Sequence, residues 1–294
     1  MTIKLARPAQ PRLWRNLAIV STTVTLAAMP GHAQSGALAL DQAAQMGARL
    51  WMADGTEGGE TAAPAEPAPA TEGGEQGEGG VEATGDETVD FLAGLLQIEG
   101  HLTSGLALIA AGDTANGQAH LGHPRAEVYD GLKHHLTELG QPQFEDALDR
   151  LLDAATDGAD APTLTALQAE VMTAIAAARD AAVTGDPRDD FSAIVFLIRK
   201  AGAEWSEGVK NGEIAELHEY QDAWGFVQAA RARATDLSAS TDAAIKSAAM
   251  ATLTALDEVA PALPSVTPTG LIGGEAEMFA GAAARIELAA YKVK

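Results

Sequence analysis

The sequence predicts an all-α protein with a duplicated four-helix unit, about eight helices in total, after a disordered acidic N-terminal linker. Three observations carry this prediction. From residue 88 onward, apolar residues recur at steps of three and four, and aromatic residues make up only 4% of the chain. Capping residues and prolines divide this region into segments of helix length. Similar residues also recur in its two halves in the same order.

The first 33 residues are expected to be a secretory signal peptide. Four basic residues precede an apolar run at 17–29, which is too short to span a bilayer. Gly31 and Ala33 supply the small residues of a cleavage site, so we expect export and cleavage after Ala33. The alternative is an uncleaved anchor. We expect no membrane-spanning segment after this one, and therefore a periplasmic or secreted protein.

Residues 34–53 and 54–87 differ in composition. The first stretch is suited to a short amphipathic helix. The second consists mostly of Gly, Pro, Ala and acidic residues, with almost nothing to bury. We therefore expect residues 54–87 to be a disordered, extended linker between the short element and the helical region.

Capping residues, prolines and glycines predict where helices begin and end. Asp86 is expected to cap a helix over about 88–111. Pro124 is expected to open a second helix, because proline is tolerated at a first helical position, and Gly140 is expected to end it. Further helix starts are expected at Pro142, Pro162, Pro187 and at Ser240 or Thr241. No segment has the pattern of a strand.

Residues 88–185 and 186–294 are predicted to be two repeats of one helical bundle. At an offset of 100, Phe91 and Ile98 correspond to Phe191 and Ile198. After a gap of two residues, His120 corresponds to His218. Single matches carry little weight in alanine-rich helices, but their order and near-constant offset favour duplication.

Charge and cysteine content exclude several classes of function. The chain carries a net charge of −22, and removing the four basic residues of the first 33 takes it to −26. Such a chain is repelled by nucleic acid and by anionic lipid, so its partners should be cationic, neutral or metallic. The absence of cysteine excludes disulfides, thiolate metal sites and a cysteine nucleophile.

Glu99 lies in the middle of the apolar arc of the first predicted helix. A lone buried carboxylate is costly, so Glu99 should be paired, metal-bound or protonated. Its repeat counterpart, Arg199, is likewise surrounded by apolar residues on its own helix. This favours a buried ion pair between Glu99 and Arg199. The alternatives are that Glu99 is a metal ligand or that the helix turns it toward water.

Four of the seven histidines lie within residues 118–136. His123 and Glu127 share a helix face with further acidic and imidazole groups, which can bind a divalent cation but is also typical of a solvated face. His101 flanks the apolar arc of the first helix, in a ligand site or in a helix-packing groove. If the first two helices pack antiparallel, the candidate metal ligands converge. They are Glu99, His101, His120, His123 and Glu127.

Motifs that point to catalysis are missing from the sequence. It has no His-Glu-x-x-His, no Glu-x-x-His in both halves, no phosphate-binding loop after a strand and no nucleophile elbow. We therefore expect a protein that is not an enzyme.

The Gly100–His101 pair, on the first long helix of an exported chain with two related bundles, resembles the imelysin-like periplasmic proteins linked to iron uptake. The hallmark of that family is Gly-x-His-x-x-Glu. In "EGHLTS" (99–104) the glycine is adjacent to the histidine, and Ser104 stands where the family has glutamate. Only His101 therefore corresponds. The resemblance covers the architecture of residues 88–294 and implies metal handling.

The leading hypothesis is non-catalytic binding of a transition-metal ion or metal complex in the cell envelope. Carboxylate and imidazole ligands suit Fe, Cu and Zn about equally. The alternative is a structural or protein-interaction module of the envelope without a metal site. In either case the expected partner is an envelope protein or a metal complex, and not nucleic acid.

Overall fold

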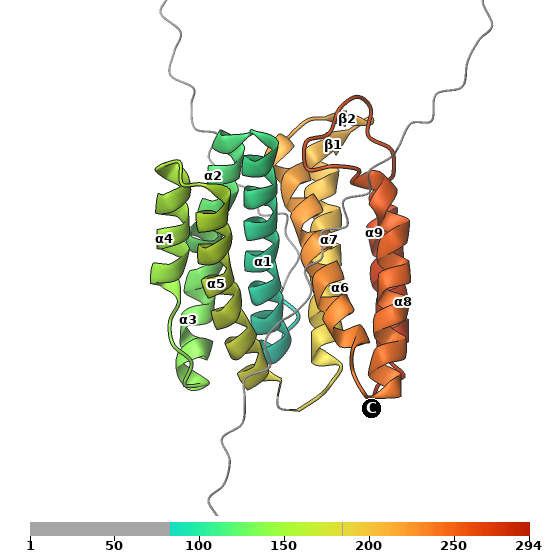
Figure 1. Cartoon of the computed structure of the whole chain (residues 1–294). Coiled ribbons are helices and arrows are strands. Elements are labelled where there is room, and N and C mark those ends of the chain that lie inside the picture. Colours follow the sequence, from blue (N-terminus) through green and yellow to red (C-terminus); the bar gives the residue numbers. More distant parts are fainter. Residues whose placement is uncertain (1–82, 184) are drawn as a thin grey trace, which may run out of the picture. The chain divides into compact units, whose positions relative to one another are not determined.

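The computed structural model describes residues 83–183 and 185–294, which form a helical bundle (Figure 1). The predicted signal peptide, the 34–53 element and the linker up to residue 82 lie outside the described residues. Within the described part of the chain, the predicted fold class is confirmed. It contains nine α-helices, a π-turn, a 3-10 turn and two strands of two residues each.

Helix α1 (Glu87–Ala111) has the boundaries that its capping residues predict. The Asp86 carboxylate accepts hydrogen bonds from the backbone N–H groups of Thr88 and Val89, which the first turn leaves without helical partners. At the other end, Gly112 adopts a left-handed φ of 90° and its N–H bonds to the Ile109 carbonyl.

The second predicted helix differs from the expectation at its start. Helix α2 (Thr114–His123) continues through a π-turn, η1 (Pro124–Val128), into α3 (Tyr129–Glu138), so Pro124 does not open a new helix. Proline has no N–H to give to a helical carbonyl and its ring clashes with the preceding turn. The wider π-turn, closed by the Tyr129 N–H on the Pro124 carbonyl, accommodates it without ending the helix.

The first half is completed by α4 (Glu145–Thr156) and α5 (Ala161–Ala182). Helix α4 packs on α5 and α2, while α2, α3 and α5 all contact α1. Counted as one bent helix, α2 to α3 therefore makes a four-helix group with α1, α4 and α5.

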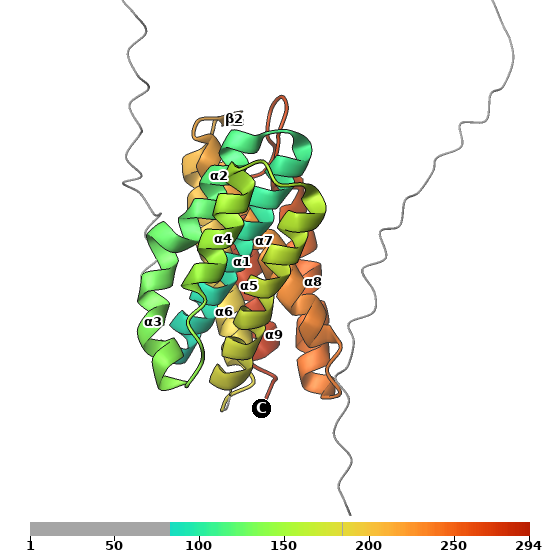
Figure 2. The ribbon, with the colours of Figure 1, turned by 60° about the vertical axis from the view of Figure 1, so that its left-hand side comes forward.

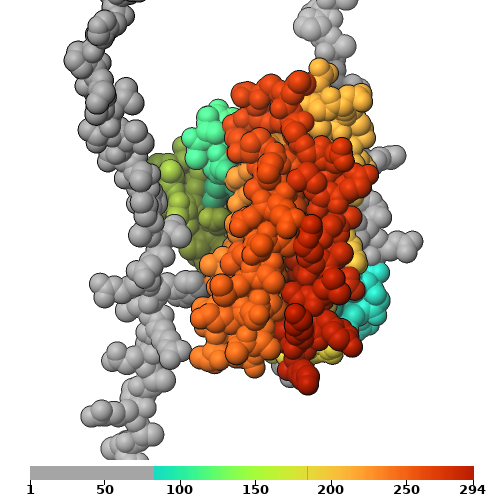
Figure 3. Space-filling view, turned by 90° about the vertical axis from the view of Figure 1, so that its right-hand side faces the viewer, coloured from blue at the N-terminus to red at the C-terminus, as the bar shows by residue number. Residues whose placement is uncertain are grey.

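The second half is a closed bundle of four helices. They are α6 (Asp189–Gly208), α7 (Leu217–Ser238), α8 (Ala243–Val259) and α9 (Glu277–Ala290). Helices α6 and α8 each contact both α7 and α9. Figure 3 shows α8 and α9, in orange and red, covering one face of this half. A 3-10 turn, η2 (Ala260–Ala262), follows α8.

A short hairpin between α6 and α7 contradicts the expectation that the chain has no strand. Strands β1 (Val209–Lys210) and β2 (Glu213–Ile214) pair antiparallel. Asn211 and Gly212 form the turn, with φ of 55° and 78°. An Asn-Gly pair favours this turn because both central positions need positive φ. The dipeptide was therefore a strand signal in the sequence.

Helix α1 joins the two halves. Figures 1 and 2 show it between the helices of the first half and those of the second. It packs on α6 and α7 as well as on its own half. Leu92 and Leu96 lie in the core of the second half, whereas Leu95 and Leu102 lie in the core of the first. The broad apolar arc of this helix thus serves two cores.

By length and composition alone, α1 could cross a membrane, which differs from the expectation that no segment after residue 33 could. Within the bundle, 72% of its apolar window is buried. A core helix that packs on two sides meets the same criteria, so this observation carries little weight for a membrane span.

Candidate metal centre

Helices α1, α2 and α7 meet at the boundary between the halves, and glycines make this close approach possible. A Cβ atom on Gly225 of α7 would collide with the Gly100 carbonyl and Ser104 Oγ of α1. With no side chain at Gly225, Ser104 Oγ donates a hydrogen bond of 2.7 Å to the Gln221 carbonyl. The side chains that follow on each helix are thereby brought within contact distance.

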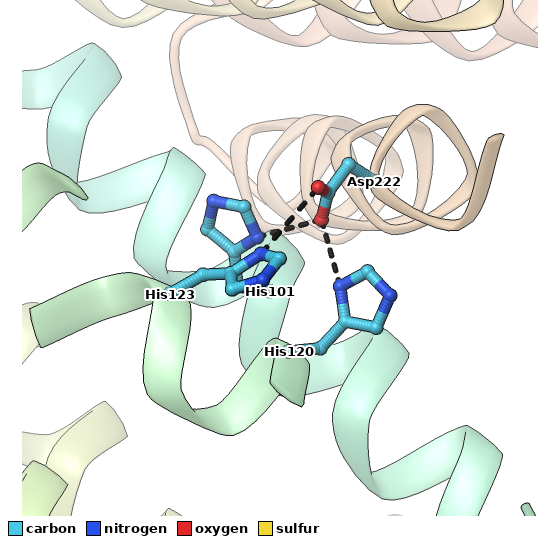
Figure 4. A group of neighbouring side chains, drawn as sticks. All are labelled: His101, His120, His123 and Asp222. Atoms are coloured by element: carbon cyan, nitrogen blue, oxygen red, sulfur yellow. Dashed lines mark hydrogen bonds and ion pairs between the residues drawn. The ribbon is translucent and has the colours of Figure 1, made fainter. Parts of the chain in front are cut away.

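Three histidines surround one carboxylate at this junction (Figure 4). Asp222 Oδ1 lies 2.7 Å from His101 Nδ1 and 2.9 Å from His120 Nδ1. Its Oδ2 lies 3.6 Å from His123 Nδ1. All four side chains are buried, and one ligand atom from each lies within 4.8 Å of the other three. We call these four residues the His₃Asp cluster.

Two further residues border the cluster. Glu127, on the π-turn, has Oε2 at 3.8 Å from His101 Nε2 and Oε1 at 3.9 Å from His123 Nδ1. The His218 ring lies 5.5 Å from the ring of His120, the residue to which the sequence comparison aligned it. These two histidines thus meet where α2 and α7 are in contact.

The electrostatics at His101 and Asp222 favour the forms of these two side chains that bind metals. Burial lowers the pKa of His101 below its usual 6.5, although Asp222 opposes this shift. Burial acts to raise the pKa of Asp222, but the charges and hydrogen bonds of His101 and His120 outweigh it and hold that pKa well below 3.8. Neutral imidazole and ionised carboxylate are the ligand states that a cation requires.

The donor set has a recognisable chemistry. Imidazole nitrogens with a carboxylate oxygen suit Fe, Cu and Zn, and three or four such protein ligands are usual for zinc. Asp222 has two roles open to it. It can ligate the metal directly, or it can hold the Nδ1–H of a histidine and orient the opposite nitrogen toward the metal, as carboxylates behind metal-binding histidines do.

The structure brings together four of the five residues that the sequence singled out. His101, His120, His123 and Glu127 converge, and the bent α2 to α3 helix lies over α1 to make this possible. Glu99 lies outside this group. Its Oε1 accepts a hydrogen bond of 2.7 Å from Arg179 Nη2 on α5.

The predicted ion pair between Glu99 and Arg199 is wrong. Arg199 is half-exposed on α6 and binds Glu287 of α9 at 3.0 Å. The offset of 100 places Arg199 on α6, which does pack on α1. However, α6 turns that position toward the surface. Arg179 of α5 pairs with Glu99 instead.

Sequence reasoning missed Asp222. It lies in "HEYQDAW" (218–224), four residues after His218, a spacing that puts both side chains on one helix face. This His-x3-Asp pair begins at His218, the residue that the sequence aligned with His120, and was a usable signal. Only the packing of α7 on α1 and α2 connects it to the other histidines.

Comparison with protein families shows a similarity in the second half of the chain. Residues 180–290 match the model of a family described as the iron permease-associated 4-helix bundle domain. The second half of this chain is similar to that domain. The matched range covers α6 to α9 and includes Asp222, while the three histidines of the cluster lie before it.

No curated protein and no solved structure matches the chain. None of the comparisons gives support to the imelysin-like resemblance. The helical-bundle architecture that the resemblance implies is present, but the family match is to the permease-associated domain.

Proposed function

We propose that this protein binds a transition-metal cation, iron in the first instance, without catalysing a reaction. The observation that carries the proposal is the meeting of His101, His120 and His123 around Asp222 in a buried junction. Burying so many polar groups together is costly unless they are paired or coordinate an ion. The similarity of residues 180–290 to an iron permease-associated domain favours iron over copper and zinc.

We place this binding in the cell envelope, beside a membrane permease that takes up the ion. Two observations support this context: the sequence features of a cleavable leader ending at Ala33, and the description of the matched family. The mass of the mature protein, recovered from the expressing cell, tests the leader. A chain that begins at Gln34 supports export with cleavage, and a chain that retains Met1 counts against cleavage after Ala33.

Titration of the full chain with Fe²⁺ under anaerobic conditions, and separately with Cu²⁺ and Zn²⁺, tests the metal site. We expect a dissociation constant below about 10 μM for iron. Because the ion binds the folded state, the melting temperature should rise with metal concentration.

His123→Ala and Asp222→Asn should weaken binding by at least about tenfold, as the loss of a ligand or of its orienting partner does. Glu258→Gln is the control, because this carboxylate lies on the surface of α8, away from the cluster, and pairs with Arg285. Equal affinity in His123→Ala and Glu258→Gln would remove the proposed site. Absence of binding for all three metals would leave the structural or interaction module as the better reading.

A further inference from the structure

We propose that the groove between α1 and α3 is the port through which hydrated divalent cations reach the His₃Asp cluster, and that Glu127 passes them inward. This inference rests on the proposed metal site and adds its route of access and the form of its substrate. The groove has a volume of about 390 Å³ and opens between the start of α1 and the face of α3.

The charge of the groove selects for cations. Its lining includes the carboxylates of Glu87, Asp90 and Glu127 and the imidazoles of His134 and His135. Among the described residues, no Lys or Arg lines it. A cleft lined by charges of one sign raises the local concentration of oppositely charged ions and speeds their association. The same charge repels anionic metal chelates. The substrate we infer is therefore the hydrated cation itself.

Glu127 lines this groove and also borders the buried cluster. Its side chain is 14% exposed, lines the groove, and has one oxygen within 4 Å of His101 and the other within 4 Å of His123. It comes from the π-turn, a conformation that is frequent at functional sites.

A second observation, a buried imidazole nitrogen next to Glu127, supports this route. His101 Nε2 is fully buried and has no hydrogen-bond partner among the described residues. It faces Glu127 Oε2 at 3.8 Å, beyond the usual hydrogen-bond range of about 2.7–3.2 Å. Two metal–ligand bonds of about 2.0–2.1 Å each span a gap of this size. A cation between these two atoms would give His101 Nε2 the bond that it lacks among the described residues.

The route can be blocked without touching the cluster, because Gly131 of α3 lines the groove. A Cβ at this position meets no atom within 4 Å, so a larger side chain there extends into open space. Gly131→Phe should fill the groove, and Gly131→Ala is the matched control that removes the glycine but leaves the groove open.

Stopped-flow binding of Co²⁺ to the full chain, followed by its removal with excess chelator, gives both rate constants. We expect Gly131→Phe to slow association and release together by at least about fivefold while the dissociation constant changes less than twofold, since a barrier alters rates and not the end states. Glu127→Gln should slow association by about tenfold, and Glu258→Gln on α8 should not.

Rates in Gly131→Phe equal to those in Gly131→Ala would overturn the port. An association rate unchanged by Glu127→Gln would overturn its transfer role. If the unaltered chain binds no metal, the proposed function itself fails, which is a different result from binding through another route.

Discussion

Arg179 of α5 holds the carboxylate of Glu99 on α1 at 2.7 Å, and both side chains are almost fully buried. This pair joins two helices of the first half at the face where α1 also meets the second half. Burial raises the pKa of Glu99 above its usual value even though Arg179 lowers it. Arg233 also lowers the pKa of Glu99, but Arg179 is the cation in direct contact with its carboxylate.

Removing the cation should be costly. We expect Arg179→Met to lower the free energy of unfolding by about 3–5 kcal/mol, because it leaves a buried charge without its partner. The double variant Glu99→Leu with Arg179→Met should recover much of that loss, since apolar replacements of a buried pair are often tolerated. Urea denaturation of both variants measures the difference.

The surface pair of Arg199 and Glu287 provides the control. It has a similar distance, 3.0 Å, but both side chains are at least half-exposed. Arg199→Met should cost less than about 1 kcal/mol. Equal losses in the free energy of unfolding for Arg179→Met and Arg199→Met would show that burial does not determine how much these ion pairs stabilise the protein.

The close contact between α1 and α7 predicts that a larger residue at Gly225 lowers both stability and metal affinity. A methyl group at Gly225 would collide with Gly100 and Ser104, so Gly225→Ala should destabilise the protein by about 1–3 kcal/mol through overpacking. Because the helices must separate, Asp222 should move away from His101 and the metal affinity should fall. Gly131→Ala, at an open helix position, should be neutral or slightly stabilising.

A buried carboxyl on α6 predicts an unusual pH dependence. Burial, followed by a hydrogen bond with Glu219, raises the pKa of Glu204 to about 9, although Lys200 opposes the shift. Between pH 4.5 and 9 the folded state keeps a proton that the unfolded state releases. This group's contribution to stability therefore declines as pH rises through that window, by up to about 1.4 kcal/mol per unit.

Glu204→Gln is neutral at every pH and should lack this decline. The free energy of unfolding of Glu204→Gln, minus that of the unaltered protein, should therefore increase from pH 5 to pH 9. Urea denaturation at several pH values measures this difference. Glu258→Gln, which removes a surface carboxylate paired with Arg285, controls for the change in net charge. A constant difference between Glu204→Gln and the unaltered protein would contradict the raised pKa.

Tyr129 predicts a local effect at the start of α4. Its buried hydroxyl accepts hydrogen bonds from the backbone N–H groups of Phe144 and Glu145 and donates one to Gln143. Tyr129→Phe leaves these donors without that acceptor and should cost about 1–3 kcal/mol. Hydrogen exchange should quicken at the first turn of α4. Tyr291→Phe, at an exposed position, should change neither measurement.

The sequence predicted local structure best where the signals are short-range. Asp86 and Gly112 bound α1 because a cap and a left-handed glycine act on their own helix end. The helix start predicted at Pro124 was wrong because long-range packing outweighed the local signal. Proline alone favours a helix start, but the packing of α2 and α3 on α1 maintains one continuous helix through a π-turn.

The candidate site shows the same difference between short-range signals and tertiary packing. His101, His120, His123 and Glu127 were found by spacing on two neighbouring helices, because residues at steps of three and four share a face. Asp222 is about 100 residues further along the chain, and no local pattern links it to them. For the same reason, the repeat offset paired Glu99 with Arg199, although an offset does not state which way a helix is turned.

The sequence by itself therefore determined that the chain is helical, near which residues helices α1, α4, α5, α6 and α8 begin, and which histidines could act together. These properties depend on backbone propensities, caps and spacing within one helix. The tertiary structure alone decided that Asp222 completes the cluster, that Arg179 neutralises Glu99, and that Arg199 faces outward. Those facts depend on the rotation and close approach of whole helices, which glycine contacts and the packing of two cores determine together.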